Sequence, residues 1–104
     1  MEGEKYLRLL HMSKVLSSPR RLVMLDLLAE EGRMRLGDIG KKLKMSNSLV
    51  SYHIKKLIQA GLVEVVNIPD MYGRAKPYYT ASKLAEKLLK SFEGQPFLKG
   101  GSHD

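Results

Sequence analysis

The feature that most constrains the fold is a very short break, at about residues 44–46, between two segments of helical periodicity. The first segment covers residues 36–44, and the second begins after Ser46, a residue type that caps helix N-termini well. A break this short leaves room only for a tight turn, so the two helices must pack against each other as a helix-turn-helix. Gly37 and Gly40 each weaken the first helix by about 1 kcal/mol relative to alanine. Glycines in such places indicate the close approach of another helix.

The segments around this pair complete a recognisable order of elements. In chain order they are helices over residues 4–16 and 19–31, a very short strand at 33–35, strands over 62–68 and 74–79, and a last helix capped by Thr80 that runs to about residue 93. Pro77 must lie at an edge or bulge because it cannot donate to a strand ladder. The predicted fold class is mainly α with a small β-hairpin: a winged helix-turn-helix of five helices and a two- to three-stranded wing sheet. Residues 1–93 form this domain, and the tail at 94–104 is expected to fray.

The distribution of charge favours an anionic partner. The 104-residue chain has 18 Lys and Arg against 11 Asp and Glu, a net charge of +7. Residues 33–76 hold nine basic and three acidic side chains, so this middle segment carries +6 of that excess. A basic surface confined to one part of a domain is typical of nucleic-acid binding. A solvated lysine-rich face is the alternative that charge alone leaves open.

The helix after Ser46 has two faces. At about 100° per residue, its apolar side carries Val50, Ile54 and Leu57, with His53 among them as a packing residue. The opposite polar side would meet a major groove. The candidate DNA-binding residues are Asn47, Ser48, Ser51, Tyr52, Lys55 and Lys56 on this helix, Lys41 and Lys44 just before it, and Arg74 and Lys76 in the wing.

Different roles are expected within this set. Asn47 could bond an adenine edge, whereas the lysines suit phosphates, which position a protein rather than specify a sequence. Capping of the first helical turn is the alternative for Asn47 and Ser48, and packing on the wing is the alternative for Tyr52. Arg20 and Arg21 could reach a phosphate or pair with acidic neighbours.

The sequence offers no sign of catalysis or of a metal site. It contains no cysteine, which excludes disulfides, thiol catalysis and cysteine-ligated metals. The three histidines, His11, His53 and His103, have no ligand spacing, and no nucleophile stands beside a base. We therefore expect no enzyme activity and no cofactor. No run of residues approaches the roughly 18 apolar residues of a membrane span, so a cytoplasmic location is expected.

Two spans resemble the ArsR-type transcriptional repressors, namely LSSPRRLVMLDLL (16–28) and SNSLVSYHIKKLIQAGLV (46–63). The wing pieces Gly73-Arg74 and Tyr78-Tyr79-Thr80 are similar as well. The resemblance implies a dimeric, prokaryotic DNA-binding repressor, and it assigns no chemistry to His53. Many such proteins sense metals through Cys on the third helix or through His and Asp on the last. This chain lacks both patterns, so its small-molecule effector, if one exists, is unknown.

The first and last helices carry more apolar surface than a small domain needs for its own core. The candidate dimer interface consists of Leu7, Leu10, Met12, Val15, Leu84, Leu88, Leu89 and Phe92. A two-fold axis would place two recognition helices about 34 Å apart, which matches adjacent major grooves. Closing the core of a single monomer is the alternative role of these helices.

The hypothesis from sequence is a sequence-specific regulator of transcription that binds double-stranded DNA as a homodimeric repressor on a palindromic operator. One rival is a winged-helix subunit that contacts only proteins, because fold alone does not fix function. Another is an architectural DNA-binding protein of weak specificity.

Overall fold

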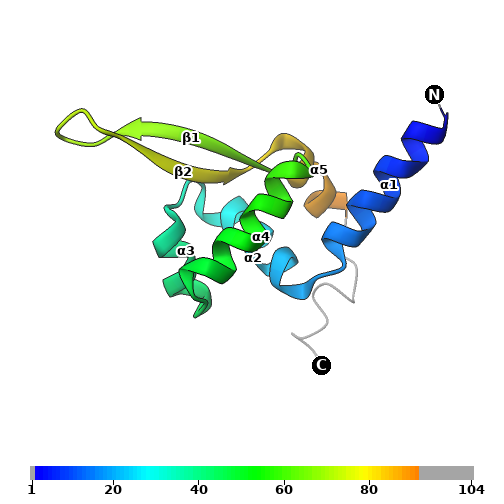
Figure 1. The fold of residues 1–104 in the computed structure, drawn as a ribbon, viewed down its shortest axis with the longest axis horizontal. Helices are drawn as coiled ribbons and strands as arrows, with labels where there is room; N and C mark the ends of the chain where they lie inside the picture. The colour runs from blue at the N-terminus through cyan, green and yellow to red at the C-terminus, as the bar shows by residue number, and fades with distance from the viewer. Residues whose placement is uncertain (1, 92–104) are drawn as a thin grey trace.

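The structure, a computed structural model, describes residues 2–91 of the chain. The elements are α1 (Glu2–Leu16), α2 (Pro19–Glu31), α3 (Leu36–Leu43), α4 (Asn47–Gln59), β1 (Val63–Pro69), β2 (Ala75–Ala81) and α5 (Lys83–Ser91). Helices α2, α3 and α4 form the body, the hairpin extends past α3, and α1 projects in the opposite direction (Figure 1). This arrangement confirms the winged helix-turn-helix with a two-stranded wing. The expected tail at 94–104 lies outside the described residues.

Capping residues set the helix boundaries that the sequence predicts. The Ser18 hydroxyl accepts a hydrogen bond from the Arg21 amide, and Pro19 occupies the first turn of α2. Helix α2 ends at Gly32, whose φ of +86° favours glycine. The Ser46 hydroxyl accepts from the Leu49 amide at 3.2 Å and so starts α4.

The turn between α3 and α4 depends on Gly40. Lys44 adopts a left-handed φ of +58°, and the Met45 amide donates to the Gly40 carbonyl at 2.9 Å. A Cβ on Gly40 would lie 2.7 Å from the Met45 carbonyl oxygen, whereas a Cβ on Gly37 would meet nothing within 4 Å. The expected close approach is therefore confirmed at Gly40 and wrong at Gly37.

One apolar core joins all the helices to the base of the wing. Its buried side chains are Val15, Met24, Leu25, Leu28, Ile39, Val50, Ile54, Leu57, Leu62, Val63, Ala81 and Ala85. Each of the five helices contributes a face to this core. The position of α4 is therefore fixed by packing rather than by polar contacts alone. Leu57 and Val50 are fully buried, as the periodicity of α4 predicts.

The wing is an antiparallel hairpin in which Val63 pairs with Ala81 and Pro69 with Ala75. The short strand expected at 33–35 is reduced to one bridge, in which Met34 and Tyr79 exchange two backbone hydrogen bonds. Tyr79 therefore directs its amide away from β1. Pro77 lies two residues earlier and faces the same open edge, so its missing donor disrupts no ladder bond.

The cap of α5 differs from the expected one. Thr80 is part of β2, because the ladder continues to the pair Val63 and Ala81. Ser82 caps the helix instead: its hydroxyl accepts from the Ala85 amide at 3.1 Å and donates to the Gly61 carbonyl at 2.7 Å. The same side chain thus ties the start of α5 to the end of α4.

Candidate nucleic-acid interface

Helix α4 presents a polar face to solvent. Asn47, Ser48 and Lys55 are exposed, and Ser51 and Lys56 are half-buried. Tyr52 is 53% exposed, and the Lys56 ammonium lies 5.6 Å from the centre of its ring. The Tyr52 ring therefore packs beside charged neighbours on both α4 and α2. Of the preceding lysines, Lys41 and Lys44 are both exposed.

The wing tip is a rigid turn built around Asp70. Its carboxylate accepts from the amides of Tyr72 and Arg74 at 2.8 and 2.9 Å, and Gly73 adopts a φ of +79°. The hydrogen bond from the Arg74 amide is the main cause that holds the pKa of Asp70 below its ordinary value. The Arg74 side chain, 67% exposed, also pairs with this carboxylate at 3.2 Å. The turn therefore holds Arg74 at the far end of the wing.

Sequence reasoning missed several features of the wing. Met71 and Tyr72 are exposed at the tip, and the Arg74 guanidinium lies 5.2 Å from the Tyr72 ring centre. Arg35, at the start of α3, lies 5.6 Å from the Tyr78 ring centre. Alternation along β2 could have indicated that Tyr78 and Lys76 share a face, because both are half-buried there. The contact of Tyr78 with Arg35 could not be predicted in this way, because it depends on the tertiary structure.

The structure gathers the candidate DNA-binding residues on three neighbouring elements. Helix α3 packs against α4, and α4 packs against β1. The hairpin reaches beyond both helices, so its tip lies apart from the exposed face of α4 (Figure 1). An extended duplex can contact α4 and the wing tip at separate places, whereas a small ligand cannot.

His53 and Arg21 form a contact beneath this face. His53 is 7% exposed, and its Nδ1 accepts a hydrogen bond from Arg21 Nε at 3.1 Å. Burial lowers the pKa of His53, and the charges of Arg21 and Arg20 lower it further. The expected packing role of His53 is consistent with this position. Arg21 donates inward, to His53 and to the Val15 carbonyl, rather than to an acidic neighbour.

Acid is expected to weaken the fold through His53. In the unfolded chain His53 has its ordinary pKa of 6.5. It therefore binds a proton at pH values at which the His53 side chain of the folded protein stays neutral. The free energy of unfolding should therefore fall as the pH drops through 6.5 toward the lowered pKa of the folded state. Urea unfolding at a series of pH values measures this slope. In His53→Asn the slope should be shallower, and an unchanged slope would show that other groups cause it.

The candidate dimer residues within 2–91 fall into three groups by burial. Leu7 and Leu10 of α1 are 66% and 60% exposed, and Leu84 of α5 is 43% exposed. Met12, Leu88 and Leu89 are half-buried against the core. Val15 is 3% exposed and belongs to the chain's own core, so the expectation that it faces a partner is corrected. Phe92 lies outside the described residues.

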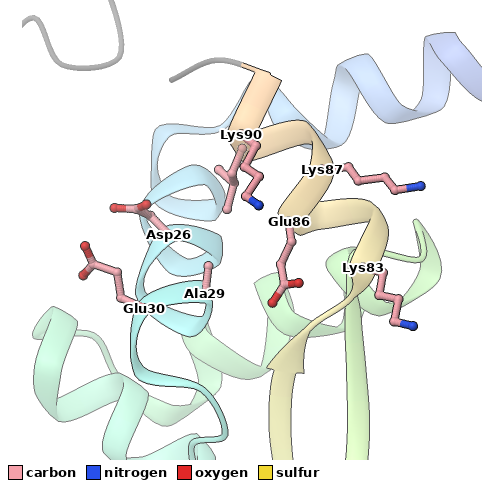
Figure 2. Close-up of a pocket in the computed structure, with 8 residues that line it drawn as sticks. Asp26, Ala29, Glu30, Lys83, Glu86, Lys87 and Lys90 are labelled. Atoms are coloured by element: carbon pink, nitrogen blue, oxygen red, sulfur yellow. The ribbon is translucent and has the colours of Figure 1, made fainter. Parts of the chain in front are cut away.

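A depression of about 630 Å³ lies between α2 and α5. Asp26 and Glu30 point away from α5, and Lys83 and Lys87 point away on the other side (Figure 2). Glu86 and Lys90 lie over the gap, but these charged groups do not converge on one point. The depression therefore lacks the convergent polar groups of a small-molecule site.

Residues 2–91 carry neither a metal-binding cluster nor a membrane-spanning helix. No group of three or more His, Asp or Glu side chains in this range could hold a metal ion. No helix among the same residues is long and apolar enough to cross a membrane.

The fold and the exposed face of α4 define a winged helix-turn-helix protein of the DNA-binding class. Comparison with known proteins gives the family. Residues 18–65 match the bacterial regulatory proteins of the arsR family. An uncharacterised HTH-type transcriptional regulator of Methanocaldococcus jannaschii is 38% identical over 87 residues, which are 84% of this chain and 93% of that protein. The chain belongs to the ArsR family of DNA-binding transcriptional regulators, which confirms the resemblance and the expectation that it is not an enzyme.

Solved structures agree on the fold. The homodimeric winged helix-turn-helix DNA-binding domain of a possible ArsR-family regulator from Mycobacterium bovis superposes with a TM-score of 0.75, at 23% identity, over 99% of this chain and 88% of that one. NolR from Sinorhizobium fredii superposes with a TM-score of 0.70, at 25% identity, over 97% of this chain and 90% of its own.

Proposed function

We propose that this regulator is a homodimer that represses transcription by occupying a palindromic operator in the cytoplasm. The observation that carries the proposal is the exposed polar face of α4, with Asn47, Ser48 and Lys55 toward solvent, together with the exposed Arg74 on the wing. The N-terminal residues of such a helix read base edges, and the flanking lysines neutralise phosphates. The chain's net charge of +7 supports the same partner.

Dimerisation is supported by α1. This helix projects from the body, and only its last turns reach the core through Met12, Val15 and Leu16 (Figure 1). At about 100° per residue, Leu7 and Leu10 lie roughly 135° and 165° around the helix from the middle of the side that carries Met12, Val15 and Leu16. A projecting apolar helix of 15 residues is marginal alone in water. The homodimeric state of the Mycobacterium bovis domain supports a second copy as its partner.

Lys55→Ala and Arg74→Ala are expected to weaken DNA binding without unfolding the domain. Each lost phosphate contact should reduce the slope of log affinity against log salt by about one. Gel shifts at several salt concentrations measure this effect on random duplex and on genomic fragments selected by the wild-type protein. Lys87→Ala, which removes an exposed charge on α5, is the matched control and should change neither slope nor affinity.

The same series separates the proposal from its rivals. Unchanged affinity in both Lys55→Ala and Arg74→Ala would rule out this docking mode. A wild-type protein with no affinity for any duplex would favour the protein-contact subunit. Footprints that cover DNA broadly, with no protected site, would favour the architectural protein.

A further inference from the structure

Arg21 makes contacts to three separate places in the structure. Its Nη1 donates to the Val15 carbonyl in the last turn of α1 at 3.3 Å, and its Nε donates to His53 Nδ1 on α4 at 3.1 Å. Its guanidinium carbon also lies 5.9 Å from the centre of the Tyr52 ring, on the exposed face of α4. One side chain of α2 therefore touches the projecting helix, the buried side of α4 and its exposed side.

The chemistry of these contacts fixes geometry. A guanidinium is planar, so the directions of its Nε and Nη1 donors are locked to each other, which a lysine ammonium cannot imitate. His53 is buried, with its ring edge-on to Tyr52 at 5.2 Å between centres. Accepting at Nδ1 leaves the remaining proton of the neutral ring on Nε2, which is buried and has no hydrogen-bond partner among residues 2–91. Arg21 thus selects both the tautomer and the orientation of His53.

We infer that Arg21 is a positioning residue for DNA recognition, which sets α4 at a defined angle to α1. This inference rests on the proposed dimeric DNA-binding function. In a dimer held through α1, the angle between α1 and α4 determines how the second recognition helix meets its half-site once the first is seated. Arg21 would therefore act on specific binding, which needs both helices in register, more than on nonspecific attraction to phosphates.

The adjacent arginine provides a matched control. Arg20 lies on the same turn of α2 and is exposed. Arg20→Met therefore removes the same charge as Arg21→Met without removing the contacts of Arg21. On random duplex the two variants should lose similar affinity. On genomic duplex selected by the wild-type protein, Arg21→Met should bind about tenfold more weakly than Arg20→Met, the scale of positioning effects transmitted through packed elements. Equal affinities on the selected duplex would overturn the inference.

Variants at His53 test the same contact from the other side. His53→Asn places an amide oxygen near the position of Nδ1 and should keep specific affinity, whereas His53→Leu fills the volume without an acceptor and should lose it as Arg21→Met does. Nitrogen NMR of the imidazole should show the Nε2–H tautomer in wild type, and the Nδ1 resonance should shift in Arg21→Met because its hydrogen bond is lost. Circular dichroism and sedimentation establish that each variant is folded and has the wild-type assembly state. If Arg21→Met does not fold, the His53 pair alone decides.

The possible failures are distinct. Wild-type protein that binds neither duplex overturns the proposed function and this inference with it. Wild-type protein that binds the selected duplex, with His53→Leu equal to His53→Asn, overturns the inference alone.

Discussion

Gly40→Ala is expected to lower the free energy of unfolding by about 1–3 kcal/mol, the usual cost of forcing extra volume into a packed site. The added Cβ would lie 2.7 Å from the Met45 carbonyl oxygen and 3.3 Å from Asn47 Oδ1. The first of these atoms is backbone, so relief requires the turn itself to move. That turn fixes the start of α4, so the folded fraction of Gly40→Ala should also bind selected duplex more weakly.

Gly37→Ala is the matched control for this prediction. It lies on the same helix, and its Cβ would meet nothing within 4 Å. Both variants gain about 1 kcal/mol of helix propensity, so Gly37→Ala should be more stable than wild type. The difference between the two variants in urea unfolding therefore isolates the steric cost at Gly40. Equal stabilities would show that the turn adjusts freely and that glycine is not required there.

The helix-turn-helix could be predicted from sequence because its determinants are local. Ser18, Ser46 and Gly32 mark helix ends through bonds to near neighbours, and these boundaries agree with the structure. The cap of α5 could not be predicted in this way. Thr80 and Ser82 are both residue types that cap helices, and the pairing of β2 with β1 decides that the strand extends to Ala81.

The candidate site shows the same division. Helical periodicity correctly separates the buried side of α4 from the exposed side that carries Tyr52 and Lys55. It could not show that Arg21 turns inward, because its acceptor on His53 lies 32 positions away in the chain. Val15 was misassigned for a related reason. Helix α1 contributes one side to the core of the chain and exposes another, and it carries apolar residues on both sides. Their allocation depends on tertiary packing.

Leu7→Glu combined with Leu10→Glu is expected to have the largest effect on DNA binding. Both side chains are mostly exposed on the face of α1 that points away from the core, so the double variant should remain folded. A carboxylate on each side of a two-fold interface would be desolvated and would repel its copy, which shifts the protein to monomer. Sedimentation at tens of micromolar and urea unfolding measure these two outcomes separately.

Loss of the dimer removes the coupling between half-sites. Two linked recognition helices gain about 10²–10⁴ in affinity over one, so the double variant should bind a selected duplex at least about a hundredfold more weakly. Its affinity for a duplex with one half-site should change little. Gln59→Glu, exposed in the last turn of α4, introduces one such carboxylate without touching α1 and should stay dimeric. A monomeric wild-type protein, or a double variant that remains dimeric, would show that α1 does not hold the dimer.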